Sequence, residues 1–343
     1  MKNRIRHYTK SRLFWPFAAL ILILLFDLLF IPGFFRLEIK EQHLYGRIID
    51  ILNRGAPLML MALGMTFVIA TEGVDLSVGA IVAIAGAVAA MLIGAETGVT
   101  RIPLLLVILL TLGGSMLCGL WNGVLVANLG IQPMVATLIL MVSGRGIAKL
   151  ITKGQILTIY YDPYSFFGGG YFLGLPVSLY VVAAAAVAAY LLARKTSFGL
   201  YIEAVGISSG ASFHSGVNEK RVKQIAYILS GLCAGIAGIL ISSNTKSADS
   251  INAGVLAELN AILSVVIGGT LMTGGRFSLL GSLIGALIIQ SLTTTIYAFG
   301  VPPTVVSVVK AIVVLLVCLI QSEVMHQKFN QWLKTNRNKV VTS

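Results

Sequence analysis

Charged residues are scarce in this sequence: Asp, Glu, Lys and Arg make up 11% of its 343 residues, whereas 57% are hydrophobic. Water-soluble domains carry about a quarter charged residues, so a single water-soluble core is excluded. The mean hydropathy of +0.91 indicates that most side chains are surrounded by lipid or neighbouring helices. A spanning helix needs about 20 apolar residues, and roughly ten such segments fit along the chain. We therefore predict an all-α integral membrane protein.

Reactive and metal-binding side chains are also few. The three cysteines, Cys118, Cys233 and Cys318, fall in apolar segments without metal or redox spacing, which is typical of small buried hydrophobic residues. The four histidines are scattered, and none forms a metal pair or an evident triad with Ser and Asp. The sequence has no Gly-x-x-x-x-Gly-Lys-Ser/Thr loop, so the chain does not cradle ATP itself. We predict a conduit that is not an enzyme and holds no cofactor or metal.

The positions of the basic residues predict an orientation for the chain, whose net charge is +12. Lys and Arg gather near the N-terminus, at both ends of the polar stretch 194–223, and after the last apolar run. Short cytoplasmic loops accumulate these residues. We therefore expect residues 1–12, the loop 194–223 and the tail 321–343 in the cytoplasm, which requires an even number of crossings. The first apolar run is too long for a signal peptide, so we interpret it as an uncleaved span.

The hydropathy pattern divides the transmembrane region, residues 13–320, into ten expected spans. Three polar segments without an excess of basic residues are expected outside the membrane, at 36–54, 152–170 and 243–258. The expected spans are 13–34, 56–71, 78–93, 103–127, 134–151, 175–192, 224–242, 259–272, 279–299 and 304–320.

Two segments, 72–79 and 268–275, interrupt the helical pattern with glycines and polar residues beside a short span. They fall in the two halves of the chain, and paired interruptions of this kind indicate an internal, inverted-repeat-like architecture with a substrate path near the midplane. Non-helical backbone is tolerated at that depth only against protein or water. The alternative is an ordinary turn at each membrane surface, because hydropathy alone does not place the depth.

Ionisable residues inside spans usually face a cavity or pair with another group. Asp75 lies in the first interruption and is either a pore residue or a helix cap. Lys310 lies near the middle of the last span, where a structural partner and a transport role are both open. Asp27 and Lys149 lie near span ends and can snorkel to the surface, so we discount them.

Amides and hydroxyls suit a sugar better than charged groups do, because they match its hydroxyls in hydrogen bonding. The same polar residues could instead be hydrogen-bonding glue between helices. The candidate path residues are Asp75, Ser77, Trp121, Asn122, Gln132, Asn260 and Gln290.

Glycine is abundant, with 36 residues, and three apolar spans contain a Gly-x-x-x-Gly pair. Small residues let helix backbones approach closely in lipid. We interpret the pairs as packing within the bundle, and the alternative is a face between subunits. The pairs are Gly119 with Gly123, Gly231 with Gly235, and Gly281 with Gly285.

Several short motifs together resemble those of one transporter family. They include Gly73-Val74-Asp75-Leu76-Ser77-Val78-Gly79, Trp121-Asn122-Gly123, Gly144-Arg145-Gly146, Glu203-Ala204-Val205-Gly206, and Val266-Ile267-Gly268-Gly269-Thr270. The chain resembles the permease subunits of bacterial ABC-type sugar importers of the ribose and galactose class. Within that class it is most similar to galactofuranose importer permeases, through strings such as Ile131-Gln132-Pro133 and Asn252-Ala253-Gly254.

The resemblance implies the rest of a transport machine in the bacterial inner membrane. It implies a second permease subunit, which in this subgroup is a different chain, a pair of cytosolic ATPases, and a periplasmic sugar-binding protein. The loop between Gly206 and Gly216 would be a coupling helix that docks on the ATPase. The residues implied in coupling are Glu203, Gly206, Ser208, Ala211, Phe213, Gly216, Asn218 and Arg221.

This sequence departs from the family pattern in two places. Gly210 lies inside the expected coupling helix and costs about 1 kcal/mol of helix stability relative to Ala, which leaves Phe213 as an apolar anchor for the partner. Glu258-Leu259-Asn260 ends in an amide where relatives usually have an acid. Two rival functions remain: an ion-coupled secondary transporter, which also uses broken helices and buried acids, and a membrane-embedded enzyme, for which no nucleophile–base pair is apparent.

Overall fold

The computed structural model describes residues 13–31, 33–36, 38–40, 43–94 and 102–321, and most of these residues are helical. Each of the ten expected spans overlaps a helix. These helices are α2 (Phe14–Phe30), α3 (Arg47–Ala70), α4 (Val78–Ile93), α5 (Leu104–Ala127), α6 (Pro133–Ile151), α8 (Val177–Lys195), α11 (Glu219–Asn244), α12 (Ala257–Ile267), α13 (Leu279–Ala298) and α14 (Pro303–Gln321).

Six of the described helices are long and apolar enough to cross a membrane, namely α3, α5, α6, α8, α11 and α13. Helices α2, α4 and α12 are shorter apolar helices packed into the same bundle. The all-helical membrane architecture is therefore confirmed, and the count of ten crossings stays a prediction. The expected cytoplasmic segment 1–12 and nearly all of the tail 321–343 lie outside the described residues.

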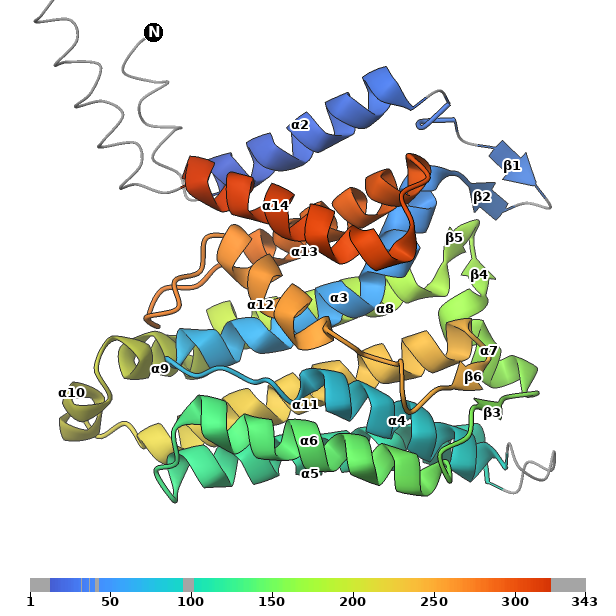
Figure 1. The fold of residues 1–343 in the computed structure, drawn as a ribbon. Coiled ribbons are helices and arrows are strands. Elements are labelled where there is room, and N and C mark those ends of the chain that lie inside the picture. Colours follow the sequence, from blue (N-terminus) through green and yellow to red (C-terminus); the bar gives the residue numbers. More distant parts are fainter. Residues whose placement is uncertain (1–12, 32, 37, 41–42, 95–101, 322–343) are drawn as a thin grey trace, which may run out of the picture.

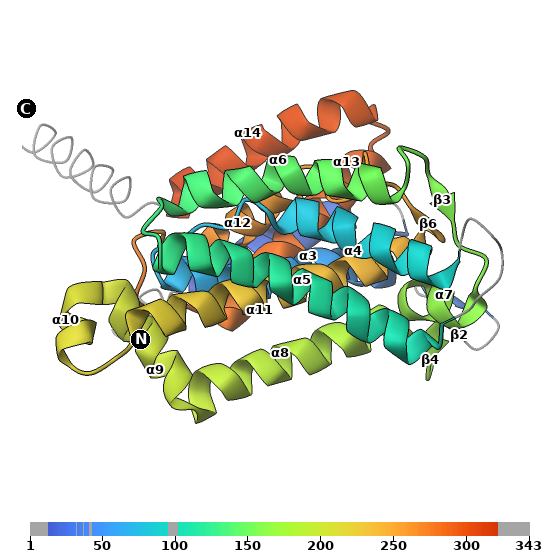
Figure 2. The ribbon, with the colours of Figure 1, turned by 90° about the horizontal axis from the view of Figure 1, so that it is seen from below.

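Helix α3 is the centre of the bundle. From Gly55 to Ala70 nearly every side chain is buried, and a helix that is apolar on all sides belongs inside a larger assembly of helices. It contacts α8, α11, α12 and α13. Helix α11 packs against α3 on one side and against α4 and α5 on the other. Figure 2 shows α5 and α6 as an outer layer over this centre.

The glycine pairs hold helices of the same chain together, as the sequence indicated. A Cβ on Gly231 would collide with the carbonyl oxygen of Ser115, and one on Gly119 would collide with that of Tyr227, so α5 and α11 touch backbone to backbone. The pair Gly281 and Gly285 brings α13 equally close to α12. Packing within the bundle is confirmed at these positions.

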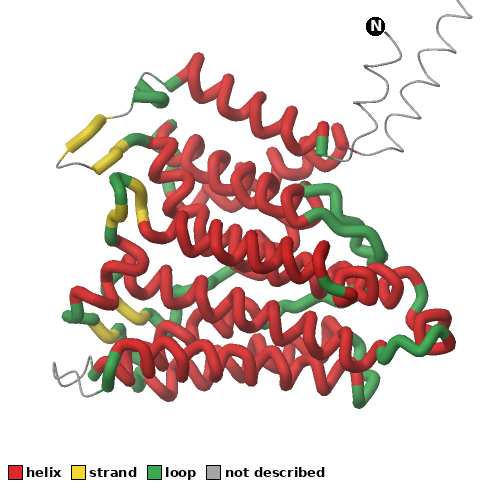
Figure 3. Tube along the Cα trace, turned by 180° about the vertical axis from the view of Figure 1, so that it is seen from behind, coloured by secondary structure: helices red, strands yellow, loops and turns green. Residues whose placement is uncertain are grey.

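The two ends of the bundle differ. At one end lie α9 (Ser197–Ile207) and α10 (Ser209–His214), and at the other lie α7 (Asp162–Gly169) and three small antiparallel sheets (Figures 1 and 3). The sheets pair β1 (Glu38–Lys40) with β2 (His43–Tyr45), β3 (Leu157–Thr158) with β6 (Ser247–Ala248), and β4 (Tyr171–Phe172) with β5 (Leu175–Pro176). All three expected outer segments reach the end with the sheets.

Two expected boundaries are wrong, and one expected outer segment contains a short helix. Helix α3 begins at Arg47, inside the segment expected as a loop, because Asp50 and Arg54 are tolerated in its first turns at the end of the bundle. Helix α12 ends at Ile267 instead of 272, because Gly268 and Gly269 follow and Gly269 has a positive φ of 86°. The polar stretch 152–170 contains α7, which packs on α8 and α11.

Candidate functional site

The first interrupted segment, between α3 and α4, is organised by one carboxylate. Asp75 Oδ1 accepts hydrogen bonds from the backbone N–H of Ser77 at 3.0 Å, the Ser77 hydroxyl at 2.6 Å and the Asn122 amide at 3.4 Å. Its Oδ2 accepts one from the Ser230 hydroxyl at 2.8 Å. All four residues are buried. The carboxylate thus joins the start of α4 to α5 and α11.

The arrangement around Asp75 is that of a helix cap. Ser77 is the residue directly before α4, and a carboxylate that accepts its N–H satisfies a donor at the positive end of the helix. These donors to the two carboxylate oxygens are neutral side chains and one backbone amide. Because Asp75 has no exposed surface, it does not face an open channel in this conformation.

The backbone of the same interrupted segment is also held by neighbouring helices. The Tyr227 hydroxyl of α11 donates to the Val74 carbonyl at 3.3 Å, and the Thr137 hydroxyl of α6 lies 3.4 Å from the same oxygen. Glu72 takes a left-handed φ of 63° where the chain leaves α3. Two neighbouring helices, α6 and α11, thus supply hydroxyl groups to the backbone of this irregular segment, as irregular backbone within a membrane would require.

The second interrupted segment follows α12 and returns the chain to α13. The Thr270 hydroxyl accepts a hydrogen bond from the Ser278 N–H at 3.2 Å, which closes the loop at the start of α13. Gly274 and Gly275 both have positive φ, 77° and 86°. The Gly275 N–H donates to the carbonyl of Ala70, the last residue of α3, at 2.9 Å. The second interruption therefore contacts the first where α3 ends.

Gly206 of α9 lies at this same junction. A Cβ on Gly206 would collide with the carbonyl oxygen of Ala70 and with the backbone nitrogen of Gly275. A Cβ on Gly274 would in turn lie 2.7 Å from the Gly206 carbonyl oxygen. The end of α9, the end of α3 and the second interruption thus meet through backbone alone, and we call this contact the Gly206 junction.

Aromatic side chains support the junction. Phe67 of α3 lies 6.2 Å from Phe198 of α9 and 5.9 Å from Phe277, which follows the second interruption, measured between ring centroids. Ile202 and Val205 of α9 are buried in the same apolar cluster. A displacement of α9 would therefore push directly on α3.

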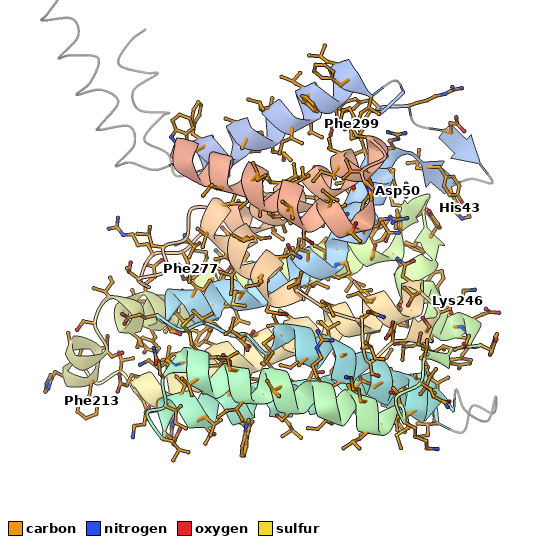
Figure 4. The ribbon with its side chains drawn as sticks, viewed as in Figure 1. His43, Asp50, Phe213, Lys246, Phe277 and Phe299 are labelled. Atoms are coloured by element: carbon orange, nitrogen blue, oxygen red, sulfur yellow. The ribbon has the colours of Figure 1, made fainter. Side chains whose placement is uncertain are left out.

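Helix α10 projects from the bundle beyond this junction (Figure 4). The Ser208 hydroxyl caps it by accepting from the Ala211 N–H at 3.3 Å, and Asn218 caps α11 by accepting from the Arg221 N–H at 3.1 Å. Gly216, with φ at 82°, provides the turn between the two helices. Phe213 is 66% exposed at the tip of α10, which leaves a large apolar ring without cover in the described chain.

The structure brings together three of the seven candidate path residues and separates the other four. Asp75, Ser77 and Asn122 form the buried cluster described above. The remaining four are Trp121, 54% exposed on α5; Gln132, exposed before α6; Asn260, half-buried on α12; and Gln290, which lies on α13 beside Gly55 of α3.

Some polar residues at buried sites were missed or undervalued from the sequence. Ser230 binds Asp75 across 155 positions of sequence, and no local signal identifies such a partner. Asp27 was discounted as a residue near a span end, and this interpretation is wrong: it is fully buried and accepts a hydrogen bond from Thr295 of α13 at 2.7 Å. Arg145 of the Gly144-Arg145-Gly146 motif donates to the Ala253 carbonyl, so this motif joins α6 to the segment before α12.

Residues 47–318 match the family described as branched-chain amino acid transport system / permease component. The galactofuranose transporter permease protein YtfT of Escherichia coli is 50% identical over 319 residues, which cover 92% of each chain. The fructose import permease protein FruF of Bifidobacterium longum is 37% identical over 94% of this chain and 91% of its own. The ribose import permease protein RbsC of Haemophilus influenzae is 34% identical over 93% of this chain and 97% of its own. No solved structure matches the chain.

Proposed function

The chain belongs to the family of branched-chain amino acid transport system permease components, and we propose that it is the permease subunit of an ATP-driven sugar importer in the bacterial inner membrane. The similarity to the galactofuranose transporter permease over almost the full length of both chains carries this proposal. Relatives named for fructose and ribose import support a sugar as the substrate class. Within that class we propose galactofuranose or a related monosaccharide.

The chain moves the sugar from periplasm to cytoplasm by alternating access and performs no chemistry itself. ATP is hydrolysed on a pair of cytosolic ATPase subunits, and a periplasmic binding protein delivers the sugar. A second permease subunit, a different chain of the same family, completes the path. Both termini and the loop 194–223 lie in the cytoplasm, because that loop and the termini carry the excess of Lys and Arg.

Helix α10 is the coupling helix in this proposal. Its exposed surface docks on the ATPase with Phe213 as the apolar anchor and with Glu203, Ala211 and Arg221 beside it. The Ser208 and Asn218 side chains cap α10 and α11. The Gly206 junction supports the proposal, because it connects α9, which leads into α10, to α3 and to the second interruption without an intervening flexible segment. ATPase closure then tilts these elements as rigid bodies.

The substrate path follows the two interrupted helices in this proposal. Asp75, Ser77 and Asn122 bind one another in the present conformation, so their amide and hydroxyl groups face the sugar only when the α3–α4 segment moves. Asn260 lies on α12 and Gln290 on α13, and both of these helices contact α3. Trp121 and Gln132 are exposed on the outer helices, and they contribute only if a second subunit covers them.

The test is ATP-driven uptake under conditions that separate the two possible energy sources. Membrane vesicles that contain this chain, with or without its ATPase and binding protein, are given radiolabelled D-galactose, D-fructose or D-ribose together with ATP. We expect uptake of at least one sugar that persists under an uncoupler and requires the ATPase. Uptake by the chain without any ATPase, or its collapse under an uncoupler that spares ATP, would instead favour the ion-coupled secondary transporter.

A further inference from the structure

A cavity of about 300 Å³ lies toward the end of the bundle that carries the small sheets. Its walls are the middle of α4, the last turns of α11, and the connecting segment 245–254. Two of its lining residues, Thr245 and Asn252, are exposed, so the cavity is open and not sealed. Its volume is at the lower limit of small-molecule sites, which start at about 300 Å³.

Two helical glycines line this space, and one of them sets how closely α4 and α11 approach, because a Cβ on Gly238 would lie 2.6 Å from the Val82 carbonyl oxygen. Gly86 of α4 and Gly238 of α11 both line the cavity. A Cβ on Gly86 would lie 3.4 Å from the Cβ of Ser242, which is ordinary van der Waals contact. A side chain larger than that of Ala at this position would therefore have to occupy the cavity. The cavity is therefore a product of residue choice on two helices that approach closely.

The segment that closes the cavity is a rigid turn and not a loose loop. Asp249 Oδ1 accepts hydrogen bonds from the backbone N–H groups of Ile251 at 2.9 Å and Asn252 at 3.0 Å, and Oδ2 accepts from the Asn252 amide at 2.8 Å. Gly254 lies against Gly79 at the start of α4 with a positive φ of 67°. The segment is thus fixed to the helix that the Asp75 cluster caps.

Arg145 braces the same turn from the side of α6, because its guanidinium donates to the Ala253 carbonyl. Burial alone would raise the pKa of Asp249, but the hydrogen bonds from Asn252 and Ile251, together with the charge of Arg145, hold that pKa below its usual value. The carboxylate is therefore an ionised acceptor near neutral pH. Each of its oxygens keeps further acceptor capacity, because an ionised carboxylate offers about four lone-pair sites.

The lining has the chemistry of a site for a neutral polyhydroxylated solute. The lining includes the Asp249 carboxylate, the Asn252 amide, and the hydroxyls of Ser242, Thr245 and Ser247, together with an apolar wall from α4. The Ser242 and Thr245 hydroxyls donate to backbone carbonyls and the Asn252 amide donates to Asp249, so toward a solute these groups serve as acceptors for its hydroxyls. Among the residues that the structure describes, no aromatic ring and no cationic side chain lines this cavity. A site without a stacking platform is suited to transient occupancy, as a transport path requires, and not to tight capture.

We propose that this cavity is a monosaccharide subsite, in which a sugar rests after release from the periplasmic side and before it passes the Asp75 cluster. This inference rests on the proposed function. The cavity reaches Val82 and Gly254, immediately beyond the Gly79 contact. Movement of α4 that opens the Asp75 cluster would also deform the cavity and release its occupant.

The test is protection of a single cysteine by sugar in vesicles that contain the whole importer. Cys118, Cys233 and Cys318 are replaced by Ala, and Ser247→Cys places a nearly isosteric thiol in the cavity wall. Right-side-out vesicles are treated with a membrane-impermeant methanethiosulfonate reagent, with D-galactose, D-ribose or D-fructose. A sugar at ten times its dissociation constant slows labelling about elevenfold by mass action. The control is Tyr160→Cys, at a residue 86% exposed at the same end, where the sugar should change nothing.

A second variant distinguishes occupancy of the cavity from a distant effect. Gly86→Leu fills the space and should abolish protection, whereas Gly114→Leu, at a glycine of α5 with open space around it, should leave protection intact. Equal labelling of Ser247→Cys with and without all three sugars, or its failure to react at all, overturns the inference. Uptake is measured separately in vesicles that contain the cysteine-free importer without Ser247→Cys. Absence of uptake in those vesicles counts against the proposed function and not against the subsite.

Discussion

Single hydroxyl groups fix the geometry of the first interruption. Asp75 is buried among neutral partners, and each oxygen of its carboxylate depends on donors from other elements. Burying a carboxylate is costly unless hydrogen bonds replace its water. Among the described residues Ser230 is the donor to Oδ2, so this one residue of α11 determines whether that oxygen is satisfied.

We expect Ser230→Ala to destabilise the protein by about 1–3 kcal/mol, because the change leaves a buried acceptor without a donor. The measurement is thermal unfolding of the detergent-solubilised protein, followed by the loss of monodisperse material. Ser143→Ala is the matched control, since Ser143 is exposed on α6 and donates only to the Ile139 carbonyl of its own helix. Equal stability of the two variants would show that the Asp75 contact is energetically neutral.

At the scale of elements, the central feature is the contact between α9, the end of α3 and the second interruption. Three backbone segments meet at Gly206, and no side chain intervenes. A Cβ at this position has no free space, because its neighbours are a carbonyl oxygen and a backbone nitrogen, and neither can rotate away. Gly210, only four positions along, has nothing within 4 Å of an added Cβ.

These two glycines therefore predict opposite outcomes for the same substitution. Gly206→Ala should separate α9 from α3 and uncouple ATP hydrolysis from sugar uptake in the assembled importer. Gly210→Ala should preserve uptake and favour the helical state of α10 by about 1 kcal/mol. The measurement is the ratio of sugar transported to ATP hydrolysed in reconstituted vesicles. An unchanged ratio in the Gly206→Ala variant would contradict direct transmission through the junction.

Helix α10 carries a separate prediction about the partner subunit. Phe213→Asp places a charge where an exposed apolar ring is available for docking, and we expect it to reduce co-purification of the ATPase without preventing membrane insertion. Ile156→Asp is the control, because Ile156 is 59% exposed at the opposite end of the bundle. Undiminished co-purification in the Phe213 variant would place the ATPase contact elsewhere.

At the scale of the whole molecule, apolar runs predicted the helices well, because each expected span is a run that a helix alone can satisfy in lipid. Glycine clusters also predicted both interruptions, where α3 and α12 end. What the sequence could not give are contacts between distant elements: Ser230 with Asp75, Thr295 with Asp27, and Gly206 with Ala70. These depend on helix packing, which hydropathy does not encode.

The separation of the two ends predicts how the molecule sits in the membrane. The end with α9 and α10 carries basic residues on both sides of these helices: Arg194 and Lys195 before α9, and Lys220, Arg221 and Lys223 after α10. The positive-inside rule therefore assigns this end to the cytoplasm. In intact spheroplasts of the cysteine-free protein, an impermeant thiol reagent should label Tyr160→Cys and leave Phe213→Cys unmodified. Both thiols should react after permeabilisation, because both native residues are exposed. Labelling of the Phe213 position in sealed spheroplasts would invert the orientation, and α10 could then not reach a cytosolic ATPase.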